Sequence, residues 1–167
     1  LADLYEIVAD AVPDRLALVA GNRRLTYAQL DERANRFAHH LLEDGVEPGD
    51  KVAIYSWDRA EWVEAMLGAF KARAVPINVN YRYVADEARY ILDNSDAVVV
   101  LHERAFSPLL ATIRADLPKL RHAVVLDCYR RLGRLRRELP QLTDPDFGAV
   151  SCTVDGRLFT MRRGDLL

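Results

Sequence analysis

Glycine is scarce in this sequence, and the eight glycines among its 167 residues are dispersed. They form no glycine-rich turn that would gather backbone N–H groups around a phosphate, which excludes a P-loop and a dinucleotide-binding fingerprint. Cysteine is scarcer still. Cys128 and Cys152 have no Cys-x-x-Cys spacing and no histidine nearby in sequence, so neither a zinc site nor a disulfide framework is indicated, and we expect two reduced thiols.

Long hydrophobic runs and a basic leader segment are also missing. The longest apolar runs are far shorter than a bilayer span, so we expect a cytoplasmic protein without a transmembrane segment. Half of the residues are hydrophobic and the formal net charge is -2, which argues against disorder and against a general affinity for nucleic acid.

Charge is unevenly divided along the chain. Residues 1–127 carry a net charge of -5, whereas residues 128–167 carry +3 and contain eight arginines but no lysine. This shift predicts an N-terminal domain over residues 1–127 and a divergent, poorly ordered tail over 128–167. Within that tail, residues 150–160 form at most a weak hairpin.

Three short β-branched runs, residues 51–56, 74–79 and 97–101, are typical of strands. The segments between them, 58–72 and 84–94, have helical periodicity. Two consecutive βαβ units of this length predict an α/β fold with an open, mostly parallel sheet flanked by helices. Pro76 cannot donate a ladder hydrogen bond, which places its strand at an edge or makes it the start of that strand.

The remaining elements surround this sheet. A helix over 3–11, with Asp3 as its cap, has one apolar face, and a small hairpin surrounds Gly21-Asn22. Thr26 and Gln29 predict a capping box for the next helix, which ends at Gly45. A helix over 107–116 and a strand over 123–126 complete the alternation. The apolar face of the first helix consists of Leu4, Ile7, Val8 and Ala11.

Three predictions concern helix ends. The 58–72 helix is apolar on most sides, so we expect it to be buried between the sheet and a neighbouring helix, with Asp58 and Glu61 near a capped start. It lacks a glycine at Ala72-Arg73, so a left-handed cap is not expected. Val84 is a poor cap, and its neighbours give no local reason for a helix to start there.

No residue is predicted to be catalytic, to bind a cofactor or to hold a metal. His39 and His40 lie near the end of a helix, and solvated histidines are the simpler interpretation for them as for His102 and His122. Ser56 and Ser95 lack the sequence context of a nucleophile elbow. Ser56 is expected to help cap the helix that follows.

Two groups of residues have both a binding and a structural interpretation. Aromatic residues near the carboxyl ends of strands are typical of a ligand cleft, but core packing or loop anchoring is the stronger alternative. Tail arginines suit phosphate contacts, but a solvated face is the stronger alternative, and a non-specific basic binder would show strongly salt-dependent retention. The aromatics are Trp57, Trp62, Tyr81 and Tyr83, and the arginines are Arg130, Arg131, Arg134, Arg136 and Arg137.

Several segments together resemble the N-terminal region of the AMP-forming adenylating enzymes. They are 25–30 (LTYAQL), 45–54 (GVEPGDKVAI) and 62–78, where the family often has glycine at the position of Arg73. Residues 78–83 (NVNYRY) and 86–96 resemble the fatty-acyl and steroid side-chain acyl-CoA ligases of actinobacteria. The resemblance covers residues 1–127, and Asp144-Pro-Asp-Phe-Gly148 resembles a segment that usually precedes the family's phosphate-binding loop.

This resemblance implies an ATP-dependent ligase that uses Mg²⁺ and CoA and acts on a fatty or steroid-derived carboxylate. The family's phosphate-binding loop and its catalytic lysine have no counterpart among the 167 residues, so no catalytic residue is carried over. We therefore expect a truncated N-terminal portion that is inactive alone, from a truncated or frame-shifted gene or a chosen fragment. The alternative is a stand-alone binding or dimerisation module, and unpaired strand edges favour self-association in either case.

Overall fold

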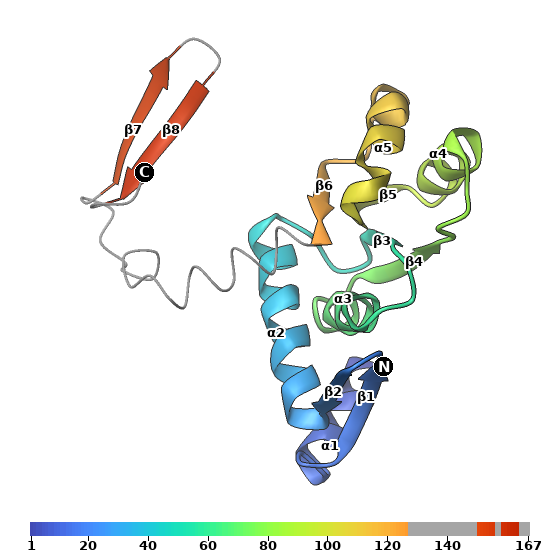
Figure 1. Cartoon of the computed structure of the whole chain (residues 1–167), viewed down its shortest axis with the longest axis vertical. Helices are drawn as coiled ribbons and strands as arrows, with labels where there is room; N and C mark the ends of the chain where they lie inside the picture. The colour runs from blue at the N-terminus through green and yellow to red at the C-terminus, as the bar shows by residue number, and fades with distance from the viewer. Residues whose placement is uncertain (127–149, 156–157, 164–167) are drawn as a thin grey trace. The chain divides into compact units, whose positions relative to one another are not determined.

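A four-stranded parallel sheet forms the centre of the N-terminal part of the chain (Figure 1). The computed structural model describes residues 1–126, 150–155 and 158–163, and the chain divides into two units, Leu1–Leu126 and Asp127–Leu167. In the first unit the strand order is β4-β3-β5-β6, and every neighbouring pair is parallel, which confirms the predicted α/β fold. The strands are β3 (Lys51–Tyr55), β4 (Val75–Val79), β5 (Ala97–His102) and β6 (His122–Val125).

The central strand β3 is buried on both faces. Ala53 and Tyr55 belong to a core cluster with side chains of α4 and α5, whereas Val52 and Ile54 point to the opposite face because side chains alternate along a strand. That opposite face is covered by α3, as Figure 1 shows. These helices are α3 (Ala60–Lys71), α4 (Ala85–Asn94) and α5 (Ser107–Ile113).

Pro76 lies on an edge strand, as predicted. The Val75 N–H donates to Asp50 O at 2.8 Å, so Val75 faces β3 and the neighbouring Pro76 faces the open edge. A residue without an N–H therefore costs no ladder bond at this position. It also makes the edge a poorer template for another strand.

At the starts of α2 and α4, the side chain three residues after the N-cap residue accepts that residue's backbone N–H. The Thr26 and Gln29 capping box is present at the start of α2 (Tyr27–Glu43), as predicted. At α4 the Glu87 carboxylate accepts the Val84 N–H at 3.0 Å, which supplies the local reason that the sequence did not reveal. Asp58 does not cap α3. The residue before α3 is Arg59, whose side chain makes no cap hydrogen bond.

The end of α3 also differs from expectation. Arg73 adopts the left-handed region with φ of 61°, and the following Ala74 N–H donates to Ala69 O at 2.9 Å. A left-handed cap is therefore present without a glycine. A side chain in this region is strained because its Cβ crowds the backbone.

Helix α3 packs closely against α2. A Cβ added to Gly68 would lie 2.5 Å from Phe37 Cδ1 and 2.9 Å from the backbone oxygen of Ala34. The helices can approach this closely only because residue 68 has no side chain. This confirms that α3 is buried between the sheet and a neighbouring helix.

The N-terminal helix α1 (Ala2–Ala11) presents a different face from the one its pattern suggests. Ala2 and Ala9 are buried, whereas Leu4, Ile7 and Val8 of the apolar face are exposed. Asp3 does not cap the helix but pairs with Arg73 on the α3–β4 turn. Beside α1 lies the predicted hairpin, formed by the antiparallel strands β1 (Leu16–Ala20) and β2 (Arg23–Thr26).

Contacts on its inner side hold α1 in place. Lys71 Nζ forms ion pairs with Glu6 and with Asp31 Oδ1, the latter at 2.9 Å, and the Tyr5 and Tyr27 rings lie 6.2 Å apart. Burial alone would lower the pKa of Lys71, but hydrogen bonds with the two carboxylates outweigh it and raise that pKa. Burial also raises the pKa of Tyr5 to about 12. The helix is thus anchored through both charged and aromatic side chains.

The second unit contains the antiparallel strands β7 (Val150–Asp155) and β8 (Leu158–Arg163), which confirm the predicted hairpin. The prediction of a poorly ordered tail falls largely on residues 127–149, outside the described ranges. The tail arginines between residues 130 and 137 also lie outside the described ranges.

Replacing Gly68 with alanine should destabilise the first unit. Overpacking against Phe37 and Ala34 outweighs the helix propensity gained, so we expect a net loss of about 1–2 kcal/mol in unfolding free energy. Urea denaturation measures this loss. The same change made together with Phe37→Leu should cost less, and a stabilised Gly68→Ala variant would show that the helices do not pack this closely.

Glycine at position 73 should give a more stable protein than alanine. Arg73→Gly and Arg73→Ala both lose the ion pair with Asp3, but only glycine relieves the strained φ. We expect the glycine variant to be more stable than the alanine variant by about 1 kcal/mol in urea denaturation. Equal stabilities would contradict a left-handed residue at this turn.

Candidate functional site

The strand order defines where this fold would hold a ligand. From β3 the chain passes through α3 to β4 on one side, then through α4 to β5 on the other side. Open parallel sheets bind ligands at such a switch point, outside the carboxyl ends of the two strands between which the order reverses. Here these are the carboxyl ends of β3 and β5.

Three buried polar residues meet at this edge. Ser56 follows β3, His102 ends β5 and Glu103 comes next, and all three are at most 4% exposed. Ser56 Oγ lies 2.8 Å from Glu103 Oε1 and 3.0 Å from Trp57 O, to either of which it donates. His102 Nδ1 lies 2.9 Å from the backbone oxygen of Glu103. Ser56 therefore bonds across the strands, and the prediction that it caps the next helix is wrong, because α3 begins at Ala60 after Arg59.

Arg59 fills the space between the two strand ends. Its Nη1 lies 2.9 and 2.8 Å from the two oxygens of Glu103, and its Nε lies 2.6 Å from Glu61 Oε2. The Glu103 side chain is only 3% exposed, so this carboxylate is buried with its charge partner. A charge held at such a depth needs a partner of opposite sign.

The ion pairs continue along α3 to the hairpin and α2. Glu61 also binds Arg23 of β2, and the next acid on the same helix face, Glu64, accepts two hydrogen bonds from Arg33 of α2, at 2.7 and 2.9 Å. Arg23 also lies 3.8 Å from Glu64. We call this alternating series the ion ladder. Its members are Glu103, Arg59, Glu61, Arg23, Glu64 and Arg33, whose formal charges cancel.

Ser56 and His102 do not form a nucleophile–base pair in this structure. Ser56 Oγ donates to Glu103 or Trp57, whereas the His102 ring bonds to the backbone oxygen of Glu103 and is buried, contrary to the prediction of a solvated histidine. In the part of the chain that the structure describes, no group of three or more His, Cys, Asp or Glu side chains is placed to hold a metal ion. At these strand ends Ser56 and Arg59 both bind the Glu103 carboxylate.

The aromatic residues proposed for a cleft contact separate partners. Trp57 lies 5.3 Å from the Phe106 ring, Trp62 Nε1 donates to Asn78 at 3.3 Å, and the Tyr81 ring lies under a neighbouring guanidinium. Packing and loop anchoring explain these three residues.

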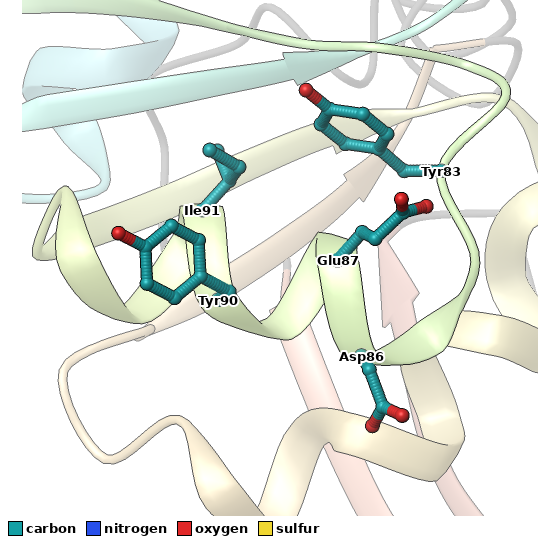
Figure 2. A pocket seen from close by; sticks show the side chains of 5 residues that line it. All are labelled: Tyr83, Asp86, Glu87, Tyr90 and Ile91. Carbon is teal, nitrogen blue, oxygen red and sulfur yellow. The ribbon is translucent and has the colours of Figure 1, made fainter.

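Tyr83, the fourth of these aromatic residues, lines a pocket. This shallow depression of about 340 Å³ lies along α4 (Figure 2). Tyr55 Oη donates to Tyr83 O at 2.9 Å, which holds the backbone of the segment that leads into α4. Burial raises the pKa of Tyr55. The residues lining the depression are Tyr83, Asp86, Glu87, Tyr90 and Ile91.

The other candidates have local roles or remain separate. His40 lies 3.6 Å from Asp44 at the end of α2, and Ser95 Oγ donates to Leu92 O at 3.3 Å at the end of α4. His122 lies on β6, away from the strand ends that hold His102. The side chains of both cysteines lie outside the described residues.

The sequence contains one signal for the ion ladder. Glu61 and Glu64 lie on a helix that is otherwise apolar nearly all round, so their carboxylates had to be buried and paired. The partner of Glu103 had no local signal, because Arg59 lies 44 residues away in sequence.

None of the helices in the described ranges combines the length and the hydrophobicity that a bilayer span requires.

Comparison with known proteins gives consistent matches. Residues 5–149 match the family model described as AMP-binding enzyme. Over 127 residues the chain is 54% identical to the 3-oxocholest-4-en-26-oate–CoA ligase of Rhodococcus rhodochrous, covering 76% of this chain and 23% of that ligase. Over 138 residues it is 50% identical to the medium/long-chain-fatty-acid–CoA/3-oxocholest-4-en-26-oate–CoA ligase of Mycobacterium marinum, covering 80% and 25%.

A solved structure also matches this chain. The N-terminal domain of FACL13 from Mycobacterium tuberculosis matches with a TM-score of 0.74 at 29% identity, over 80% of this chain and 35% of that one. The chain spans about a quarter of the length of the two curated relatives named above.

Breaking the ladder at Glu103 should be costly. Glu103→Gln leaves the Arg59 guanidinium without one of its two carboxylates, so we expect a loss of about 2–3 kcal/mol in unfolding free energy. Urea denaturation at neutral pH measures it. The control is Glu32→Gln, whose side chain is 68% exposed in its pair with Arg36 and should cost less than about 0.5 kcal/mol. Similar losses in both variants would contradict a buried ladder.

Proposed function

The chain belongs to the family of AMP-binding enzymes, and on this premise we propose that it is the N-terminal part of an ATP-dependent acyl-CoA ligase. One observation carries the proposal: about half of its residues are identical to those of acyl-CoA ligases over the region matched. The complete protein would act in the cytoplasm and convert a carboxylate, ATP and CoA into acyl-CoA, AMP and pyrophosphate.

The proposed reaction has two steps. A carboxylate oxygen of the substrate attacks the α-phosphorus of ATP, pyrophosphate leaves, and an acyl-adenylate forms. The sulfur of CoA then attacks the acyl carbon, its proton is lost, and AMP leaves. Both steps develop negative charge on phosphate oxygens, so the enzyme must place hydrogen-bond donors or cations there.

The described residues do not fit ATP or Mg²⁺. The Glu103 carboxylate at the switch point is bound by Ser56 and Arg59, and the dispersed glycines provide no loop around a phosphate. We therefore assign residues 1–126 a scaffolding role and propose that the chain is inactive alone. Donors and cations for both steps would come from a polypeptide region outside this chain.

The substrate class follows from the relatives' names. One relative is named for a steroid-derived carboxylate and the other for both that compound and medium- or long-chain fatty acids. We propose that the complete protein takes a carboxylate with a large apolar group.

The isolated chain should bind neither the nucleotide nor the intermediate. Titration calorimetry with ATP and Mg²⁺, followed by a non-hydrolysable acyl-adenylate analogue, should give no binding heat, because the described residues offer no free set of donors around a phosphate. Micromolar binding of either compound would overturn the scaffold assignment.

A chimera provides the positive control for this titration. In it, the matched 127 residues of the present chain replace their counterparts in the Rhodococcus rhodochrous ligase. The chimera should bind the analogue and catalyse ATP–pyrophosphate exchange when the steroid carboxylate is present. A folded chimera without exchange activity would contradict the proposed function.

A further inference from the structure

Helix α1 presents its most hydrophobic side to solvent. Leu4 and Ile7 are each 65% exposed, and Val8 is 42% exposed, while the small residues of the opposite side are buried. Leu1, just before the helix, is exposed as well. We call these four side chains the α1 outer face. Their spacing places them on one stripe, which normally packs against a core.

The helix cannot turn to bury this stripe. The buried Lys71 binds Glu6 and the Tyr5 ring contacts Tyr27, and at the exposed start of the helix Arg73 binds Asp3. Rotating α1 would break both ion pairs. A contiguous apolar face on an anchored helix is typical of an interaction site.

Two possible occupants fit the face poorly. A second copy would bury only one helix face, which is small beside the roughly 800 Å² per partner of a stable interface. A membrane surface favours helices with lysine or arginine on the polar side. Helix α1 has neither residue, and its only charged side chains are the carboxylates of Asp3, Glu6 and Asp10.

We propose that the α1 outer face docks against an apolar surface of the ligase region that lies outside this chain. This inference rests on the proposed function. The relatives are about four times as long as the region matched, and the family match begins at residue 5, within α1. Asp3 and Glu6 at the border of the face are already paired with cations, so an uncharged partner surface suits it.

The test compares one substitution in two settings. In the isolated chain, Ile7→Glu should leave the apparent Tm unchanged within about 1 °C, because the side chain is mostly in water. In the Rhodococcus chimera the same change should lower the apparent Tm by at least about 4 °C, because it places a carboxylate in an apolar contact. Leu4→Glu should behave in the same way.

Val84→Glu is the matched control. Val84 is 62% exposed and lies at the start of α4, so this change should leave the Tm of both the isolated chain and the chimera unaltered. Equal effects of Ile7→Glu and Val84→Glu in the chimera would overturn the docking proposal.

The remaining outcomes are also decisive. A lower Tm for the isolated Ile7→Glu chain would mean that its own residues already cover the face. An Ile7-dependent dimer in light scattering, or Ile7-dependent sedimentation with phosphatidylcholine vesicles, would assign the face to a second copy or to lipid. Each overturns the proposal, as does a chimera that fails to fold with the unaltered segment. A folded chimera without exchange activity contradicts the proposed function only, since its Tm still tests docking.

Discussion

The burial of three carboxylates on and beside α3 is the constraint on which the rest of the first unit depends. Glu103, Glu61 and Glu64 are each less than a tenth exposed, and an unpaired charge at such a depth would cost several kcal/mol. Their arginine partners come from three places: the segment before α3, strand β2 and helix α2. The ion ladder therefore joins the sheet edge, the hairpin and α2 to one helix. Apolar packing alone would not require arginines at these three places.

The sequence predicted the parts of the fold that local patterns determine. The β-branched runs identified three central strands, Thr26 and Gln29 identified the start of α2, and Pro76 identified an edge. The α1 prediction failed in an informative way: periodicity shows which side chains share a face, but not which side of the helix the chain covers. Arg73 showed a related limit, because a turn can impose a left-handed backbone on a residue that disfavours it.

The switch-point crevice was beyond sequence reasoning because its contacts are long-range. No local pattern links Ser56 or Arg59 to Glu103, because Glu103 lies 47 and 44 residues away from them in sequence. Folding brings these three residues and His102 to one sheet edge, where ion pairs and hydrogen bonds occupy the position at which related architectures hold ligands. The proposed function therefore rests on sequence identity to ligases, and the observed geometry supports the proposed scaffolding role.

The position of β3 has a consequence for how the chain is made. This strand is the first of the sheet to be synthesised, yet it lies between β4 and β5, so its second neighbour emerges only after some fifty further residues. Until then the edge of β3 that later pairs with β5 has no partner strand, and Glu103 is not yet present to pair with Arg59. Non-local pairing of this kind slows folding and exposes sticky intermediates. A nascent chain stalled before β5 would therefore bind chaperones. A chain synthesised beyond His102 can pair β3 with both of its neighbouring strands.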